Sequence, residues 1–432
     1  MICFVPGSSE PPSRDTKMEF SFLHAADLHL GSPLLGLTAK HPGVAERFAA
    51  ASRNAFTDLV TQAIERNVAF VLIAGDVYDR EWKDNSIGLF FNREVALLDR
   101  ERIPVFLVKG NHDAASVVTK TIGLPASVAQ FPTAKAETIR LPELGVAIHG
   151  RSFPDREVTE NYALTYPAPV PGFFNVGVLH TSCDGRPGHA AYAPCSVADL
   201  ASRGYDYWAL GHVHAFEVLS ENPWIVFPGN LQGRSVRECG PKGAVMVDVK
   251  GGAVANVSHI SLDRARWAEI TVPLDGVDRE PAALQAIEER IQELVAAAGD
   301  RMIALRVRLT GASGLDRAIR SDPRRFADEV QAAAHHCGEE VWLEQLKVDT
   351  ADAGGNGDDH PAVSTLDLAA MLDGLEHDPT LRAKAAELIA TVAAKLPGGM
   401  EMDETPLSAN LDGLLGEARA LLLGRAGPPA RC

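Results

Sequence analysis

The first part of the chain alternates between short apolar runs and longer amphipathic stretches. The apolar runs cover residues 19–26, 68–74 and 103–108, and the amphipathic stretches cover residues 44–67 and 85–100. The runs have the length and apolar content of buried strands, and the stretches carry the apolar stripe of a helix. This strand–helix–strand–helix–strand order predicts a parallel sheet with right-handed crossover connections.

Each of these three predicted strands ends in a polar cluster. Asp27 and His29 follow the first strand, and Asp76 follows the second. The third strand leads into Gly110-Asn111-His112-Asp113, where the glycine lets the backbone turn sharply. Because ligands of parallel sheets gather at the carboxyl ends of the strands, we expect the three clusters to share one edge.

Two further clusters follow apolar runs later in the chain. His180 comes after residues 175–179, and His212 and His214 come after residues 205–210. Side chains at alternate positions of an extended chain point to the same side, so His212 and His214 can act as a pair. The same spacing pairs the two polar residues that follow the first strand.

Seven side chains in these five clusters offer nitrogen or oxygen, and no sulfur, to a metal ion. Alone, each has an ordinary interpretation as a turn, capping or core residue. Their shared position at strand ends predicts one centre for two divalent ions, manganese first, with iron or zinc as alternatives. The predicted metal ligands are Asp27, His29, Asp76, Asn111, His180, His212 and His214.

The motifs are similar, in type and order, to those of the calcineurin-like metallophosphoesterase superfamily. The series is Asp27-x-His29, Gly75-Asp76-x-x-Asp79, Gly110-Asn111-His112-Asp113, His180 and Gly211-His212-x-His214. Within that superfamily the chain resembles the SbcD-type DNA repair exonucleases, and in particular the bacterial YhaO family. The resemblance covers roughly residues 18–350.

This resemblance implies a role for each residue of the motifs. One metal ion would be held by Asp27, His29, Asp76 and His214, and the other by Asp76, Asn111, His180 and His212. Asp76 would bridge the two ions. His112 would be the catalytic general acid for the leaving oxygen, and Asp79 and Asp113 would orient their neighbours.

The resemblance also implies an α/β (α+β) fold in four layers, a β-sandwich flanked by helices. We expect this phosphoesterase domain over residues 18–265 and a small α+β capping domain over residues 266–349. A Gly/Asp-rich flexible linker over 350–361 and a helical C-terminal segment over 362–432 would follow. Residues 1–17, rich in Ser and Pro, are predicted to be a disordered extension, with Met18 as a second candidate start.

The composition fits a soluble globular protein, with 46% hydrophobic and 23% charged residues. No apolar run approaches the roughly 18 residues that cross a bilayer, so we predict a cytoplasmic protein without a membrane partner. Six cysteines without a CxxC pair favour neither a cysteine zinc site nor a disulfide scaffold.

The function predicted from these features is a metal-dependent phosphodiesterase, a DNA exonuclease or endonuclease subunit of a DNA repair complex. The alternative is a phosphoesterase for a small-molecule or protein phosphate. A net charge of −16 means that DNA binding needs a local basic surface or a partner that contacts phosphate. Candidates for the basic surface are Arg80, Lys83, Arg234 and Arg237.

The C-terminal segment predicts a protein partner. Its apolar stripes need to be covered, and its linker and acidic bias suit docking better than phosphate contact. The resemblance implies an SbcC-like coiled-coil ATPase that binds these helices. Packing of the helices back on the capping domain, or pairing in a homodimer, is the alternative that the sequence leaves open.

Overall fold

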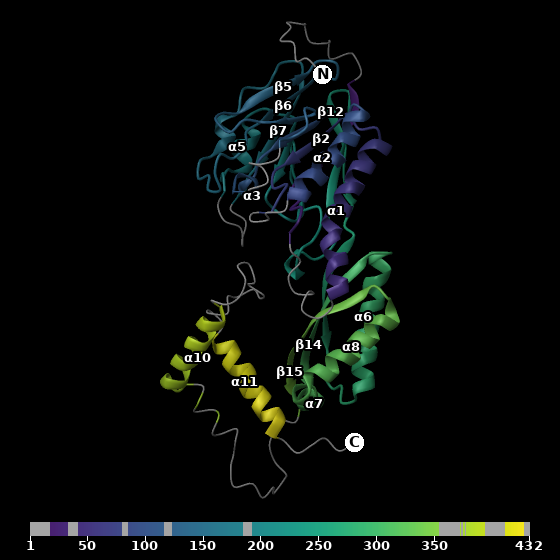
Figure 1. Ribbon diagram of the computed structural model, residues 1–432, viewed down its shortest axis with the longest axis vertical. Coiled ribbons are helices and arrows are strands. Elements are labelled where there is room, and N and C mark those ends of the chain that lie inside the picture. The colour runs from purple at the N-terminus through teal and green to yellow at the C-terminus, as the bar shows by residue number, and fades with distance from the viewer. Residues whose placement is uncertain are drawn as a thin grey trace, which may run out of the picture. The chain divides into compact units, whose positions relative to one another are not determined.

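The computed structural model describes residues 18–32, 42–79, 85–115, 123–184, 192–353, 372, 375, 377–393 and 411–426. Within them the chain forms two compact units, the first ending at Arg266 and the second beginning at Trp267 (Figure 1). The predicted extension over residues 1–17 and the candidates Arg80 and Lys83 lie outside the described residues.

The first unit contains a six-stranded sheet in the order β12-β11-β1-β2-β3-β4. Strands β1 to β4 run parallel to one another, and β11 and β12 add an antiparallel ladder on the other side of β1. The bounds are β1 (Glu19–Ala25), β2 (Phe70–Ala74), β3 (Val105–Val108), β4 (Val128–Gln130), β11 (Gly243–Lys250) and β12 (Ala253–Ser261).

A second six-stranded sheet has the order β5-β6-β7-β8-β10-β9. Its four central strands are parallel, and the edge strands β5 and β9 are antiparallel to their neighbours. The bounds are β5 (Glu137–Leu141), β6 (Val146–Gly150), β7 (Phe174–His180), β8 (Tyr207–Gly211), β9 (Phe216–Glu221) and β10 (Trp224–Pro228).

The inner faces of the two sheets enclose one hydrophobic core. Phe22 of β1 stacks on Phe70 of β2 with ring centroids 4.8 Å apart, and it meets the edge of Tyr207 of β8 at 5.3 Å. All three side chains are buried. Aromatic pairs of this kind add stability beyond the area that they bury, so the two sheets are held together as a sandwich.

Helices cover the outer faces of both sheets. α1 (Pro42–Glu65) and α2 (Asn85–Arg100) pack on the first sheet through buried side chains such as Phe56 and Phe91. The 3-10 helix η1 (Tyr162–Thr165) and α5 (Val197–Ala201) pack on the second sheet. The predicted sandwich flanked by helices is therefore confirmed.

The second unit is built on a three-stranded sheet in the order β13-β14-β15. Its strands are β13 (Ala265–Pro273), β14 (Met302–Ser313) and β15 (Val341–Asp352), and α6 (Glu280–Ala298), α7 (Asp316–Ser321) and α8 (Pro323–Cys337) share its core. β15 pairs with β14 as far as Asp352. The prediction of a linker from residue 350 is therefore wrong for residues 350–352, which belong to the strand. The backbone ladder needs no apolar side chain there.

Two helices of the predicted C-terminal segment are described, α10 (Pro379–Ala393) and α11 (Leu411–Ala426). Arg382 of α10 and Asp412 of α11 form an ion pair at 2.6 Å. The start of this predicted segment, residues 362–376, lies outside the described residues except for residues 372 and 375. None of the described helices combines the length and the apolarity that a bilayer-spanning segment needs.

Candidate metal centre

Strand ends bring the predicted donors to one edge of the sandwich. Asp27 and His29 follow β1, Asp76 follows β2, and Asn111 begins the short helix α3 (Asn111–Ala115) after β3. The loops after β1 and β2 are joined by backbone hydrogen bonds, in which Asp27 N donates to Gly75 O and His29 N to Asp76 O, both at 3.0 Å. Parallel strands thus place these loops side by side, as predicted.

The second sheet supplies the remaining three donors. His180 is the last residue of β7, and His212 and His214 follow β8. β7 and β8 are parallel, with His180 in register with Gly211. The backbone N of His212 donates to Oδ2 of Asp27 at 2.8 Å, which joins the two sheets at this edge.

Four of the predicted donors occupy a strained backbone region. The φ angles are 51° at Asp27, 41° at His29, 54° at Asp76 and 103° at His212. Residues other than glycine rarely adopt positive φ, and each instance costs of order 1–3 kcal/mol. Such conformations persist where the surrounding structure fixes them, and they are typical of functional sites.

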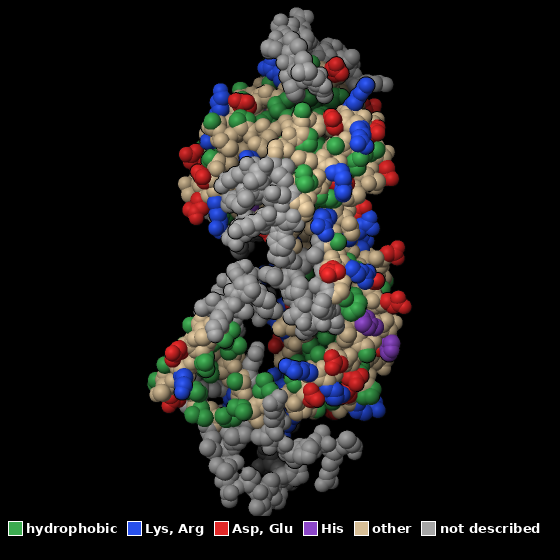
Figure 2. All heavy atoms as spheres, viewed as in Figure 1, with side chains coloured by type: hydrophobic (Ala, Val, Ile, Leu, Met, Phe, Trp, Pro, Cys, Tyr) green, Lys and Arg blue, Asp and Glu red, His purple; other side chains and the backbone are tan. Residues whose placement is uncertain are grey.

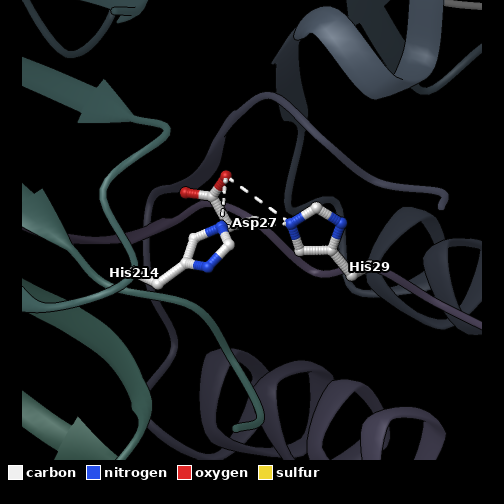
Figure 3. A group of neighbouring side chains, drawn as sticks. All are labelled: Asp27, His29 and His214. Carbon is white, nitrogen blue, oxygen red and sulfur yellow. Dashed lines mark hydrogen bonds and ion pairs between the residues drawn. The ribbon is translucent and has the colours of Figure 1, made fainter. Parts of the chain in front are cut away.

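Asp27, His29 and His214 form the first donor cluster, with their polar atoms turned toward one another (Figure 3). The Nε2 atoms of His29 and His214 are 3.2 Å apart, and Oδ1 of Asp27 lies 3.9 Å and 3.7 Å from them. Oδ1 of Asp27 is buried without a hydrogen bond from any described residue. A buried carboxylate oxygen that faces two imidazole nitrogens is a donor set that fits a divalent transition metal.

Asp76, Asn111 and His180 form the second cluster. Nε2 of His180 lies 3.0 Å from Oδ1 of Asn111 and 3.5 Å from Oδ2 of Asp76. The other ring nitrogen, Nδ1, donates to the Ala74 carbonyl at 2.9 Å, which leaves the Nε2 lone pair facing Asp76 and Asn111. Asp76 also lies within donor range of the first cluster through His29, so one carboxylate reaches both.

His112 lies at the same edge, beside the donors. Its Nδ1 is 2.9 Å from Oδ1 of Asp79, and its Nε2 is 4.0 Å from Oδ2 of Asp76. Asp113 accepts from the backbone N of Tyr78 and of Gly110, both at 3.1 Å. The two carboxylates predicted to orient their neighbours therefore bind the loops that carry Asp76 and Asn111.

Burial and charge move the pKa values of the two carboxylates in opposite directions. Burial raises the pKa of Asp76 to about 8. Burial also opposes ionisation of Asp27, but the polar contact and charge of His214, with Nε2 3.7 Å from Oδ1, prevail and lower the pKa of Asp27 to about 2. Burial, followed by the charge of Arg234, holds the pKa of His29 well below its usual value. Carboxylates with divergent pKa values in one buried cluster are typical of functional sites.

The structure adds one group that the sequence patterns did not indicate, Glu238. It ends the 3-10 helix η2 (Val236–Glu238), with Oε1 2.7 Å from Nδ1 of His214. Arg234, a candidate for substrate binding, is half-buried and paired with Glu238 at 3.0 Å. Arg237 is exposed. On the face shown in Figure 2, the described Lys and Arg side chains are interspersed with Asp and Glu.

The fold agrees with comparisons to known proteins. Residues 20–216 match the family of calcineurin-like phosphoesterases. Residues 20–216 therefore carry a calcineurin-like phosphoesterase domain. Residues 267–351 match the middle domain of metallophosphoesterase YhaO, a match that begins where the second unit begins.

Two relatives and one solved structure illustrate the range of likeness. An uncharacterized metallophosphoesterase YhaO of Bacillus subtilis is 29% identical over 378 residues, which cover 85% of this chain and 92% of the relative. The DNA double-strand break repair protein Mre11 of Archaeoglobus fulgidus is 37% identical over 95 residues, 22% of this chain and 20% of the relative. A dimetal phosphatase of Danio rerio, at 12% identity and a TM-score of 0.34, covers 56% of this chain and 99% of its own.

Proposed function

We propose that this metallophosphoesterase is a dinuclear-metal phosphodiesterase that hydrolyses DNA as a nuclease in DNA repair. The observation that carries the proposal is the position of Asp76, which lies within donor range of His29 in the first cluster and of His180 in the second. Asp27, His29, Asp76 and His214 would hold one ion, and Asp76, Asn111, His180 and His212 would hold the other. Manganese is the first choice of metal, with iron or zinc as alternatives.

His112, Asp79 and Asp113 have separate roles in the proposed hydrolysis. Two divalent ions at this site would supply an activated water and neutralise phosphate charge. His112, with Nδ1 on Asp79, presents Nε2 toward Asp76 and is suited to protonate the departing oxygen. Asp79 keeps that ring in one orientation, and Asp113 ties together the loops that carry Asp76 and Asn111.

Support for DNA as the substrate comes from the partial likeness to a DNA double-strand break repair protein. The acidic net charge of −16 favours a narrow basic contact, or a partner that shares the phosphate contacts. We propose Arg237 as part of that contact and the C-terminal helices as the docking site of an SbcC-like coiled-coil ATPase. Packing of the helices back on the capping domain, or a homodimer through them, is the alternative.

The test is one hydrolysis assay with four substrates. Metal-stripped protein is reloaded with Mn²⁺ and given single-stranded DNA, double-stranded DNA, bis-p-nitrophenyl phosphate and p-nitrophenyl phosphate. We expect Mn²⁺-dependent cleavage of a DNA substrate and of the diester. Turnover of p-nitrophenyl phosphate alone would replace the nuclease proposal with a monoesterase acting on a small-molecule or protein phosphate. No Mn²⁺-dependent turnover of any substrate would overturn both.

A further inference from the structure

The side chain of Glu238 contacts Nδ1 of His214, whereas Asp27 and His29 lie on the Nε2 side of the same ring. We infer that Glu238 is the positioning residue that makes His214 a metal donor. The inference rests on the proposed function, because it assumes that this edge of the sandwich binds two ions. It assigns Glu238 a role in metal affinity rather than in contact with the substrate.

The hydrogen bond between the two residues determines which ring nitrogen carries the proton. Oε1 of Glu238 lies 2.7 Å from Nδ1 of His214. A carboxylate can only accept, so Nδ1 carries the hydrogen and donates it. In the neutral ring, Nε2 then offers its lone pair to the side where Asp27 and His29 lie, at 3.7 Å and 3.2 Å.

Glu238 is itself fixed by donors on both of its oxygens. Oε2 accepts from Nδ2 of Asn230 at 2.7 Å and from the backbone N of Arg234 at 2.8 Å. Oε1 accepts from Nη2 of Arg234 at 3.0 Å, in addition to His214. Every partner on these two oxygens is a donor, so a neutral amide at position 238 would set its NH₂ group against donors in either orientation.

The main chain of His214 is held by the same segment. Nζ of Lys242, a buried lysine, donates to the His214 carbonyl at 2.6 Å. Asn230, the partner of Glu238, forms a parallel bridge with Ala26, the residue before Asp27. Residues 230–242 therefore fix His214 at its side chain and its backbone, and join it to the loop that supplies Asp27.

A simpler role for Glu238 is to pair with Arg234 and stabilise the loop. The two roles differ in what they predict for metal binding. If Glu238 only stabilises the loop, its loss would lower the free energy of unfolding. The affinities of the two metal-binding steps would then be either unchanged or weakened equally. If Glu238 positions His214, its loss weakens binding of the ion that His214 would hold. Binding of the ion assigned to Asn111 and His180 stays unchanged, since neither of those residues contacts Glu238. His180 has its own fixed acceptor, the Ala74 carbonyl at 2.9 Å.

The experiment measures Mn²⁺ binding by calorimetry to the full-length, metal-stripped protein. The variants are Glu238→Gln, Glu238→Asp and the control Glu221→Gln, which changes an exposed glutamate at the end of β9. We expect two binding steps in the wild type and the control. In Glu238→Gln one step should weaken by roughly 10- to 100-fold, the usual effect of removing a residue that orients a metal ligand, and the other should be unchanged.

Glu238→Asp keeps the negative charge of the carboxylate but shortens its reach to His214 and Arg234. It should weaken the same step by a smaller factor, and it serves as the test if Glu238→Gln fails to fold. Wild-type affinity at both steps in a folded Glu238 variant, or equal weakening of both steps, would overturn the inference and leave the proposed function intact. Absence of two binding steps in the wild type would instead count against the proposed function.

Discussion

Nδ1 of His112 lies 2.9 Å from Oδ1 of Asp79, so a residue after β3 is oriented by a residue after β2. This contact turns Nε2 of His112 toward Asp76 without making His112 part of either predicted ligand set. We predict that His112→Gln keeps two metal equivalents and loses about 10²- to 10⁴-fold in turnover of a diester. Metal analysis and steady-state kinetics on one preparation provide the check.

Asp79→Asn is the companion variant, because it removes the carboxylate and leaves His112 in place. A smaller loss of turnover than in His112→Gln, with both metal equivalents retained, is the expected result. Loss of a metal equivalent in His112→Gln would show that His112 is a ligand.

Asp76 lies within donor range of residues of both donor clusters, His29 and His180. We predict that Asp76→Ala abolishes metal-dependent hydrolysis and sharply reduces bound metal, because one carboxylate serves both ions. Elemental analysis of the purified variant measures the metal. Two equivalents, as in the wild type, would disprove the bridging assignment.

Gly211 is the point where the end of β8 comes closest to β2. A Cβ at this position would overlap the Ala74 carbonyl oxygen, which is backbone and cannot rotate away. We predict that Gly211→Ala lowers the free energy of unfolding by about 1–3 kcal/mol or more, and weakens metal binding through the adjacent His212. Gly123→Ala is the control, because a Cβ there meets nothing within 4 Å. Equal urea midpoints for the two variants would contradict the prediction.

Arg237 and Arg234 should respond differently to charge reversal. Arg237 is exposed, so Arg237→Glu should weaken DNA binding and reduce the slope of log affinity against log salt by about 1. Arg234→Glu should also reduce metal content, because it places a second carboxylate against Glu238. Lys250→Glu is the control, at the opposite end of the sheet beside Glu19. A salt slope unchanged in Arg237→Glu would remove this residue from the DNA contact.

His24 makes the stability of the fold depend on pH. The ring is fully buried: Nε2 donates to the Leu210 carbonyl, and Nδ1 accepts from the Tyr207 hydroxyl, both at 3.0 Å. Burial lowers its pKa from 6.5 to about 3. Between these values the unfolded chain binds a proton that the folded chain does not, so stability falls as pH falls, by about 1.4 kcal/mol per pH unit.

Comparison with His24→Gln isolates this contribution from that of other titrating groups. The free energy of unfolding, measured by urea denaturation at pH 8, 6 and 5, should fall less steeply below pH 6.5 in the variant. Above pH 6.5 the two proteins should differ by a constant amount. Parallel curves below pH 6.5 would rule out His24 as the source of the slope.

The sequence predicted the elements that are buried on both faces. β2 and β3 are continuous apolar runs, and α2 was predicted with the bounds Asn85–Arg100 that it has in the structure. The edge strands β5, β9 and β12 were not predicted, because their side chains are half-buried or exposed and give no apolar run. Pairing with a neighbouring strand, rather than local pattern, makes these segments strands.

The same distinction explains what could be predicted of the site. Each of the seven proposed donors lies at the end of a buried strand or a few residues beyond it, which is the signal that identified them. Glu238 ends a short 3-10 helix in a loop without such a strand before it. Its contact with His214, 24 residues away, depends on the path of residues 215–237 through β9, β10 and the loop before η2, which no local pattern specifies.

The origin of the donors in both sheets has a consequence for biosynthesis. Asp27 follows the first strand of the sandwich, whereas His214 is made 187 residues later, about 10–40 s at typical bacterial and eukaryotic elongation rates. Before the second sheet is made, the proposed donors in the nascent chain are those that follow β1, β2 and β3, which are Asp27, His29, Asp76 and Asn111. Binding of metal ions by the complete set of proposed donors would therefore follow synthesis of both sheets. It would stabilise the assembled sandwich and would not direct its assembly.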